Sequence, residues 1–147
     1  MAKEQVITTR QATPANVEAI VVQSNGDKEK TVDLATGFVR LQYYESLLQD
    51  AIRVTVAYSD TGNTIDGKTA MVGLPMVGQE TTRLKFTDNN DETIDVKLYI
   101  NKISQVYEDT TGSLVMLDLA SKEFILNEKI RLHTRFDGKI SEHIKKI

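Results

Sequence analysis

The stretch GNTIDGKT, which starts at Gly62, carries the strongest chemical signature in the sequence. It fits the pattern GxxxxGK[ST], in which backbone N–H groups hold phosphate, a lysine supplies positive charge and a hydroxyl binds Mg²⁺. The apolar run 114–118 ends in Asp118, the kind of acidic residue that would hold the metal in such a site. Gly62, Gly67, Lys68 and Thr69 are therefore candidates for a nucleotide site.

The surroundings of this motif argue against nucleotide binding. The phosphate cradle needs a helix that begins at Lys68, but Gly73, Pro75 and Gly78 interrupt such a helix almost at once. The fold class also needs parallel strands joined by helical crossovers, whereas most connections here are long enough only for hairpins. A phosphate-loop nucleotide binder is thus the least favoured function, and we expect no cofactor.

Other reactive residue types are sparse or badly spaced. One polar stretch crowds four oxygen-bearing residues together: Asp88, Asn90, Asp91 and Glu92. A calcium loop would need Gly and Glu where Thr93 and Tyr99 stand, so we predict a hairpin turn and no metal. His133 and His143 lie ten residues apart with no triad or zinc spacing, and the chain has no cysteine. We expect no catalytic residues and no enzyme activity.

Aromatic residues remain as binding candidates. Tyr43 and Tyr44 are neighbours on a predicted strand, so their side chains should face opposite sides, one toward the core and one toward an interface. Together with Tyr58 they could also rim a groove for a sugar or a peptide.

The composition indicates a single globular domain. The chain has 147 residues, 40% hydrophobic and 27% charged, and its formal net charge of -3 does not favour binding to nucleic acid. No apolar run is long enough to span a bilayer, and the absence of cysteine fits synthesis in the cytoplasm or another reducing compartment. Residues 121–147 hold seven Lys and Arg against four Asp and Glu, so Arg131 and Arg135 are candidates for contact with an acidic partner.

Hydrophobic periodicity predicts an antiparallel β-protein that follows a flexible arm, residues 1–16. We expect strands at 17–23, 31–34, 38–44, 52–58, 82–87, 94–106, 113–119 and 130–136. Short helices are expected at 45–49, after the cap Ser121 through about Asn127, and from Ile140 to Ile147. Residues 59–78 should form a long loop.

Two further features of the pattern bear on the architecture. The apolar register of the strand 94–106 slips before Ile103, which predicts a bulge and a curved strand that suits a barrel. The last apolar face, which ends at Ile147, stops within two helical turns, so we expect that this chain is the N-terminal piece of a longer protein.

Three segments carry a resemblance to a known family: VRLQYYESL at 39–47, LPMVGQE at 74–80, and 122–147 with its KISE. In this order and spacing, residues 32–147 resemble the first tube-like domain of the baseplate hub proteins of T-even-type contractile-tailed phages. The resemblance implies a mainly β fold, a tail-tube-like antiparallel barrel or sandwich over residues 17–147 with a helix packed against it and a C-terminal helix.

The resemblance also implies a function. It implies a non-enzymatic virion protein that joins the tail tube to the central spike and lines the channel through which double-stranded DNA passes. Such hubs are homotrimers that contact the tail spike and the tube-initiating proteins, with no membrane involved. The alternative that the residues leave open is a monomeric β-barrel binding module for a sugar or a peptide.

Overall fold

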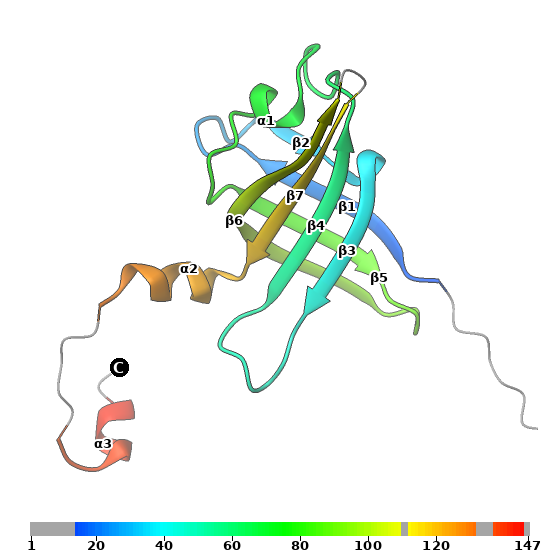
Figure 1. Cartoon of the computed structure of the whole chain (residues 1–147). Helices are drawn as coiled ribbons and strands as arrows, with labels where there is room; N and C mark the ends of the chain where they lie inside the picture. The colour runs from blue at the N-terminus through cyan, green and yellow to red at the C-terminus, as the bar shows by residue number, and fades with distance from the viewer. Residues whose placement is uncertain (1–13, 110–111, 132–136, 146–147) are drawn as a thin grey trace, which may run out of the picture.

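The computed structural model describes residues 14–109, 112–131 and 137–145. Within these ranges the strands form one sheet of seven, in the order β2-β1-β5-β6-β7-β4-β3, and every neighbouring pair is antiparallel. The sheet curls into a half-barrel, in which β1 and β5 cross behind β4 and β7 (Figure 1). The predicted mainly β, antiparallel barrel-like fold with short helices is confirmed.

The strands are β1 (Asn16–Gln23), β2 (Thr31–Asp33), β3 (Phe38–Tyr44), β4 (Arg53–Asp60), β5 (Thr81–Thr87), β6 (Thr93–Asp109) and β7 (Gly112–Ala120). The helices are the 3-10 turn η1 (Ala35–Gly37), α1 (Ala70–Gly73), α2 (Lys122–Lys129) and α3 (Ile140–Ile144). Each predicted strand up to residue 119 is present. Their apolar residues alternate with polar ones, and in a strand this alternation places all the apolar side chains on the one face that can be buried.

The core fills the space between the two crossing layers of the curled sheet. Alternate residues of the central strands supply it, and the fully buried ones include Ile20, Val56, Leu84, Ile100 and Leu117. This period-two burial is what holds each strand in its register, since a slip by one residue would turn its apolar set outward.

The long strand β6 belongs to both layers. Its first part, up to Tyr99, pairs with β5, and its second part, from Tyr99 on, pairs with β7. The pairing with β7 shifts between Ile100 and Lys102 and again between Gln105 and Tyr107. The predicted bulge is thus confirmed: it lets Ile100 and Ile103 both pack against the core while the strand bends from one layer into the other.

The turn η1 joins the two edge strands and covers the open side of the half-barrel at one end. Leu34, just before it, is buried, and its N–H donates to the carbonyl oxygen of Ile20 over 2.9 Å. Gly37, at the end of η1, lies so close to β4 that only a residue without a Cβ fits there. The half-barrel therefore closes partly through this turn and not through strand pairing.

The long loop predicted at 59–78 covers residues 61–80, because Ser59 and Asp60 still belong to β4, and it also contributes to the core. It contains the one-turn helix α1, whose N-cap Thr69 accepts from the N–H of Val72 over 3.3 Å. Ala70, Leu74 and Met76 are buried within the main core cluster. The loop thus plugs one end of the half-barrel.

One local prediction is wrong, and one helix runs slightly further than predicted. Residues 45–49 are not helical: a hydrogen-bonded turn joins β3 to β4, with the N–H of Gln49 on the carbonyl of Ser46 over 3.1 Å. The helix α2 continues to Lys129, and its C-cap Ile130 is already extended. Most of the strand predicted at 130–136 lies outside the described residues, as does the arm before residue 14, and α3 covers Ile140 to Ile144.

Candidate functional site

The candidate phosphate loop is organised around a buried carboxylate of the chain itself. Asp60, the last residue of β4, is 2% exposed. Its Oδ1 accepts from the N–H of Gly62 over 3.0 Å and from the hydroxyl of Thr64 over 2.8 Å, and its Oδ2 accepts from the N–H of Ala70 over 2.6 Å. Two donors of the motif, the N–H of Gly62 and the hydroxyl of Thr64, and the N–H of Ala70 just after it therefore bind this carboxylate.

The remaining residues of the motif also bind within the loop itself. The N–H of Lys68 donates to the carbonyl of Ile65 over 2.9 Å in a tight turn, and the helix that follows, α1, has only four residues. Asp60 pairs with Ser113 on β7, and Asp118 lies five residues further along that strand. At the rise of an antiparallel strand, Asp118 is therefore about 17 Å from Ser113. The structure therefore brings Gly62, Gly67, Lys68 and Thr69 together but leaves the expected metal-holding residue far from them.

A second buried carboxylate holds the other end of the loop. Glu80 is 0% exposed, and its two oxygens accept from the N–H groups of Val77 and Gly78, each over 2.8 Å. Its backbone carbonyl accepts from Ile100 over 3.0 Å, which ties the loop to β6. Sequence reasoning missed both carboxylates, although an acidic residue directly beside a glycine-rich loop is a typical signal for such a cap.

The acidic stretch predicted as a hairpin turn forms the connection between β5 and β6. Oδ1 of Asp88 accepts from the N–H groups of Asn90 over 2.7 Å and Glu92 over 2.9 Å. These backbone donors hold the pKa of Asp88 below its ordinary value, because they stabilise the charged form. Within the described ranges, no three His, Asp or Glu residues gather as a metal site would require.

The three tyrosines separate as strand geometry predicts. Tyr43 packs on Phe86 with ring centroids 5.4 Å apart, and its hydroxyl donates to Glu45 over 2.8 Å. Burial and this hydrogen bond raise the pKa of Tyr43 to about 12. Tyr58 is 1% exposed, and burial together with the charge of Asp60 raises its pKa as well. Only Tyr44, about half exposed, remains at the surface.

Two adjoining hollows flank the ring of Phe124, where the start of α2 lies beside β6. The larger has a volume of about 470 Å³, and its lining is mixed: Val77 and Ile125 are apolar, whereas Gln79, Glu128 and Lys129 are polar or charged. The smaller, of about 260 Å³, includes Tyr44 and Arg53. Asn101 and Phe124 line both, so the two hollows form one continuous groove, which we call the α2 groove.

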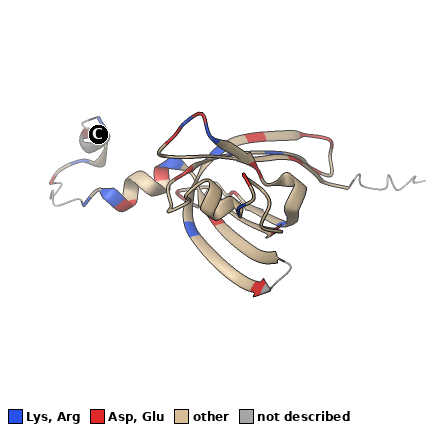
Figure 2. Ribbon diagram, turned by 90° about the horizontal axis from the view of Figure 1, so that it is seen from above, with Lys and Arg blue, Asp and Glu red and all other residues tan. Residues whose placement is uncertain are grey.

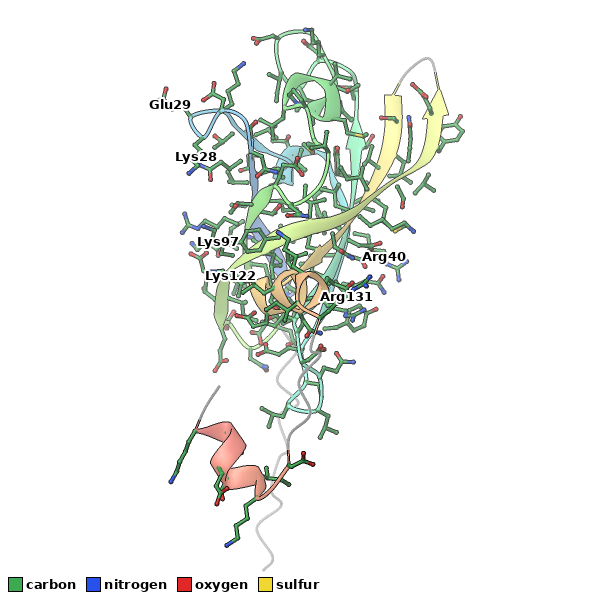
Figure 3. The ribbon with its side chains drawn as sticks, turned by 90° about the vertical axis from the view of Figure 1, so that its left-hand side faces the viewer. Lys28, Glu29, Arg40, Lys97, Lys122 and Arg131 are labelled. Atoms are coloured by element: carbon green, nitrogen blue, oxygen red, sulfur yellow. The ribbon has the colours of Figure 1, made fainter. Side chains whose placement is uncertain are left out.

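Two cations border the α2 groove. The guanidinium of Arg53 lies 4.6 Å above the ring of Phe124, and Nζ of Lys129 donates to Oε1 of Gln79 over 2.9 Å. Neither cation has a carboxylate partner among the residues that the structure describes. Figure 3 places Arg131 close to α2, whereas Arg135 and His133 lie outside the described residues.

Strand β3 forms one of the two edges of the sheet. Within the described ranges β3 pairs only with β4, so its other edge has no strand beside it. The apolar side chains Phe38 and Val39 are exposed on this strand, as is Tyr44. Val106 and Tyr107 are also exposed near the tip of the long β6–β7 hairpin, where β6 has passed beyond β5.

The charges of the surface are interspersed (Figure 2). On the outer face of β1, β5 and β6, Lys85 pairs with Glu18 and Arg83 with Asp95. A surface on which both signs of charge are mixed does not attract a polyanion such as nucleic acid strongly.

Comparison with known proteins gives no assignment: no protein-family model matches the chain, and neither does any curated protein. Among the helices of the described residues, none combines the length and the apolar character needed to cross a membrane.

Proposed function

We propose that this chain is a structural, non-enzymatic subunit of the baseplate hub of a contractile-tailed phage, assembled in the virion from several copies. In this role it joins the tail tube to the central spike and forms part of the channel through which double-stranded DNA passes. Its partners are further copies of itself, as a trimer in the complete hub, the tail spike and the tube-initiating proteins. The proposal starts from the three sequence segments at 39–47, 74–80 and 122–147.

The observation that carries the proposal is the open edge of β3. A strand edge with free N–H and C=O groups pairs readily with another strand, and soluble monomers usually protect such an edge with charges or prolines. On β3 the exposed side chains include Phe38, Val39 and Tyr44, with Arg40 as the one charged residue of the strand. A ring component uses an edge of this kind to continue its sheet into a neighbour.

The charge of the chain supports passage of DNA without binding. A conduit for DNA should not hold phosphates, and a surface of mixed sign with a net charge of -3 provides no strong attraction.

The alternative function, a monomeric module for a sugar or a peptide, would need a groove rimmed by exposed aromatic rings. Of its three candidate tyrosines, Tyr43 packs on the core and Tyr58 is buried, so only Tyr44 presents an exposed ring at a hollow. This arrangement favours the assembly proposal.

Amide hydrogen exchange at low and high protein concentration tests the proposal. In a monomer, half of the β3 amides point away from β4 and exchange quickly, whereas edge pairing in an assembly slows them. We expect protection of β3 to rise with concentration in the wild type and to stay low in Val39→Lys. Val72→Lys, at an exposed position of α1, is the matched control and should behave like the wild type.

Protection of β3 that stays low at every concentration would contradict edge assembly. In that case, saturable binding of an oligosaccharide or peptide at Tyr44 would establish the alternative instead.

A further inference from the structure

The connection between β1 and β2 carries the pair Asn25–Gly26, which the proposed function does not use. Of the seven asparagines in the sequence, only Asn25 precedes a glycine, and both residues of the pair are exposed. Asparagine is a chemically labile residue, because its side-chain amide can react with the backbone nitrogen of the next residue. A glycine in the next position favours this reaction, since it has no Cβ beside the reacting nitrogen.

The structure leaves the reacting nitrogen loosely held. The N–H of Gly26 donates to the hydroxyl of Ser24 over 3.3 Å, which is longer than the usual range for such a bond. A Cβ at position 26 would meet nothing nearer than Ser24 Oγ at 4.0 Å, so the space beside Gly26 is open. The backbone nitrogen of Gly26 is therefore available to the side chain of Asn25.

Asn63 provides a contrast within the same chain. It is also exposed and also lies in a loop. The next residue, Thr64, is β-branched, and its N–H donates to the carbonyl of Lys68 over 3.0 Å. The hydroxyl of Thr64 is held as well, by Asp60 over 2.8 Å. The nitrogen that would react with Asn63 is thus fixed in a hydrogen bond of its own.

We propose that Asn25 is a site of spontaneous deamidation. The backbone nitrogen of Gly26 attacks Cγ of Asn25, and the new C–N bond closes a succinimide ring. The bond between Cγ and Nδ2 breaks, and ammonia leaves with the proton that the Gly26 nitrogen gives up. Water then opens the ring at either carbonyl group, so the product is aspartate or isoaspartate at position 25. The reaction needs only water and does not depend on the hub proposal.

Deamidation removes a hydrogen bond between two parts of the fold. Nδ2 of Asn25 donates to the carbonyl of Gly78 over 3.1 Å and so joins the β1–β2 connection to the 61–80 loop. A carboxylate has no hydrogen to donate, and its charge repels a carbonyl oxygen. The carboxylate of Glu80, which accepts from the N–H of Gly78, adds to this repulsion. The modified chain therefore holds the loop less firmly at Gly78.

Peptide mass spectrometry of the folded protein tests the modification. Purified chains are incubated at neutral and at alkaline pH, and isoaspartate is labelled with an isoaspartyl methyltransferase. We expect the modification at Asn25 to accumulate at least about tenfold faster than at Asn63. It should also be faster at alkaline pH, because the attacking nitrogen must lose its proton. Equal amounts at the two positions would overturn the inference.

Gly26→Ala tests the attack by the backbone nitrogen of residue 26. The structure has room for the added methyl group, so circular dichroism should show an unchanged fold. We expect deamidation of Asn25 to slow at least about tenfold in this variant, because the methyl group hinders closure of the ring. An unchanged rate would contradict this route.

Asn25→Asp imitates one product and tests the effect on the loop. We expect the backbone amide hydrogens of Val77 and Gly78 to exchange faster in this variant than in the wild type. Asn63→Asp is the matched control and should leave their exchange unchanged. Equal exchange in all three proteins would overturn the role of Asn25 in holding the loop.

Discussion

Gly37 and Ser59 touch backbone to backbone, and this contact closes the half-barrel. A Cβ at position 37 would lie 2.3 Å from the carbonyl oxygen of Ser59, closer than any real Cβ contact. The turn η1 can therefore approach β4 only because residue 37 is glycine. The open side of the sheet is bridged at this point, although β2 and β3 do not pair with each other.

We predict that Gly37→Ala destabilises the fold by about 1 to 3 kcal/mol, because the added methyl group forces η1 away from β4. Urea unfolding followed by circular dichroism measures this change. Gly26→Ala is the matched control: its Cβ would meet nothing nearer than Ser24 Oγ at 4.0 Å. If the two variants unfold at the same urea concentration, the close approach of Gly37 to Ser59 does not stabilise the fold.

Glu80→Gln should also destabilise the fold, by about 1 to 3 kcal/mol. Both oxygens of Glu80 accept backbone N–H groups, so an amide in its place turns an N–H donor toward another donor in a buried site. The exposed residue Glu29 gives the control, Glu29→Gln, which should unfold like the wild type. Equal stability of both variants would show that the caps of the 61–80 loop are not needed.

Leu74→Ala should cost about 2 to 5 kcal/mol, since Leu74 is 1% exposed and lies within the main core cluster. Val72→Ala, two residues earlier on α1 at 63% exposure, should change stability by no more than about 0.5 kcal/mol. The free energy of unfolding of the two variants is compared by urea titration. A small effect at Leu74 would mean that the loop does not plug the barrel.

The Asp88 turn should lose its stabilising effect in acid. The pKa of Asp88 is lower in the folded protein than its ordinary value of 3.8, because backbone N–H groups stabilise its charged form. The unfolded state therefore binds more protons in this range, and the contribution is present above pH 3.8 and lost as the pH falls below it. Asp88→Asn should show a weaker fall in stability between pH 5 and pH 3 than the wild type in parallel urea titrations. Identical pH profiles would contradict this role of Asp88.

The sequence predicts most strands of this fold because their apolar residues alternate and polar turns separate them. The bulge in β6 was predictable for the same reason, since the apolar register slips before Ile103. The pairing of β1 with β5 and of β4 with β7 was not, because it depends on how the sheet curls and not on any local pattern.

The errors have physical causes as well. The Leu47–Leu48 pair suggests a helical turn by its side chains, yet the Ser46 hydroxyl competes for the backbone N–H of Leu48 and favours a tight turn. The motif at 62–69 has the right residues for phosphate, but Asp60, which lies just outside it, accepts hydrogen bonds from the N–H of Gly62 and the hydroxyl of Thr64. Leu74 and Met76 are buried although they lie in a loop. The apolar residues of a loop have no regular spacing, so the sequence does not indicate which of them are buried.

The most direct test of the proposed assembly is the solution mass of the chain, measured by size-exclusion chromatography with multi-angle light scattering at several concentrations. One chain has a mass of 16.5 kDa. Edge pairing through β3 predicts that the mass rises with concentration to a multiple of this value, with Val39→Lys lower than the wild type. A mass of 16.5 kDa at every concentration would contradict the account.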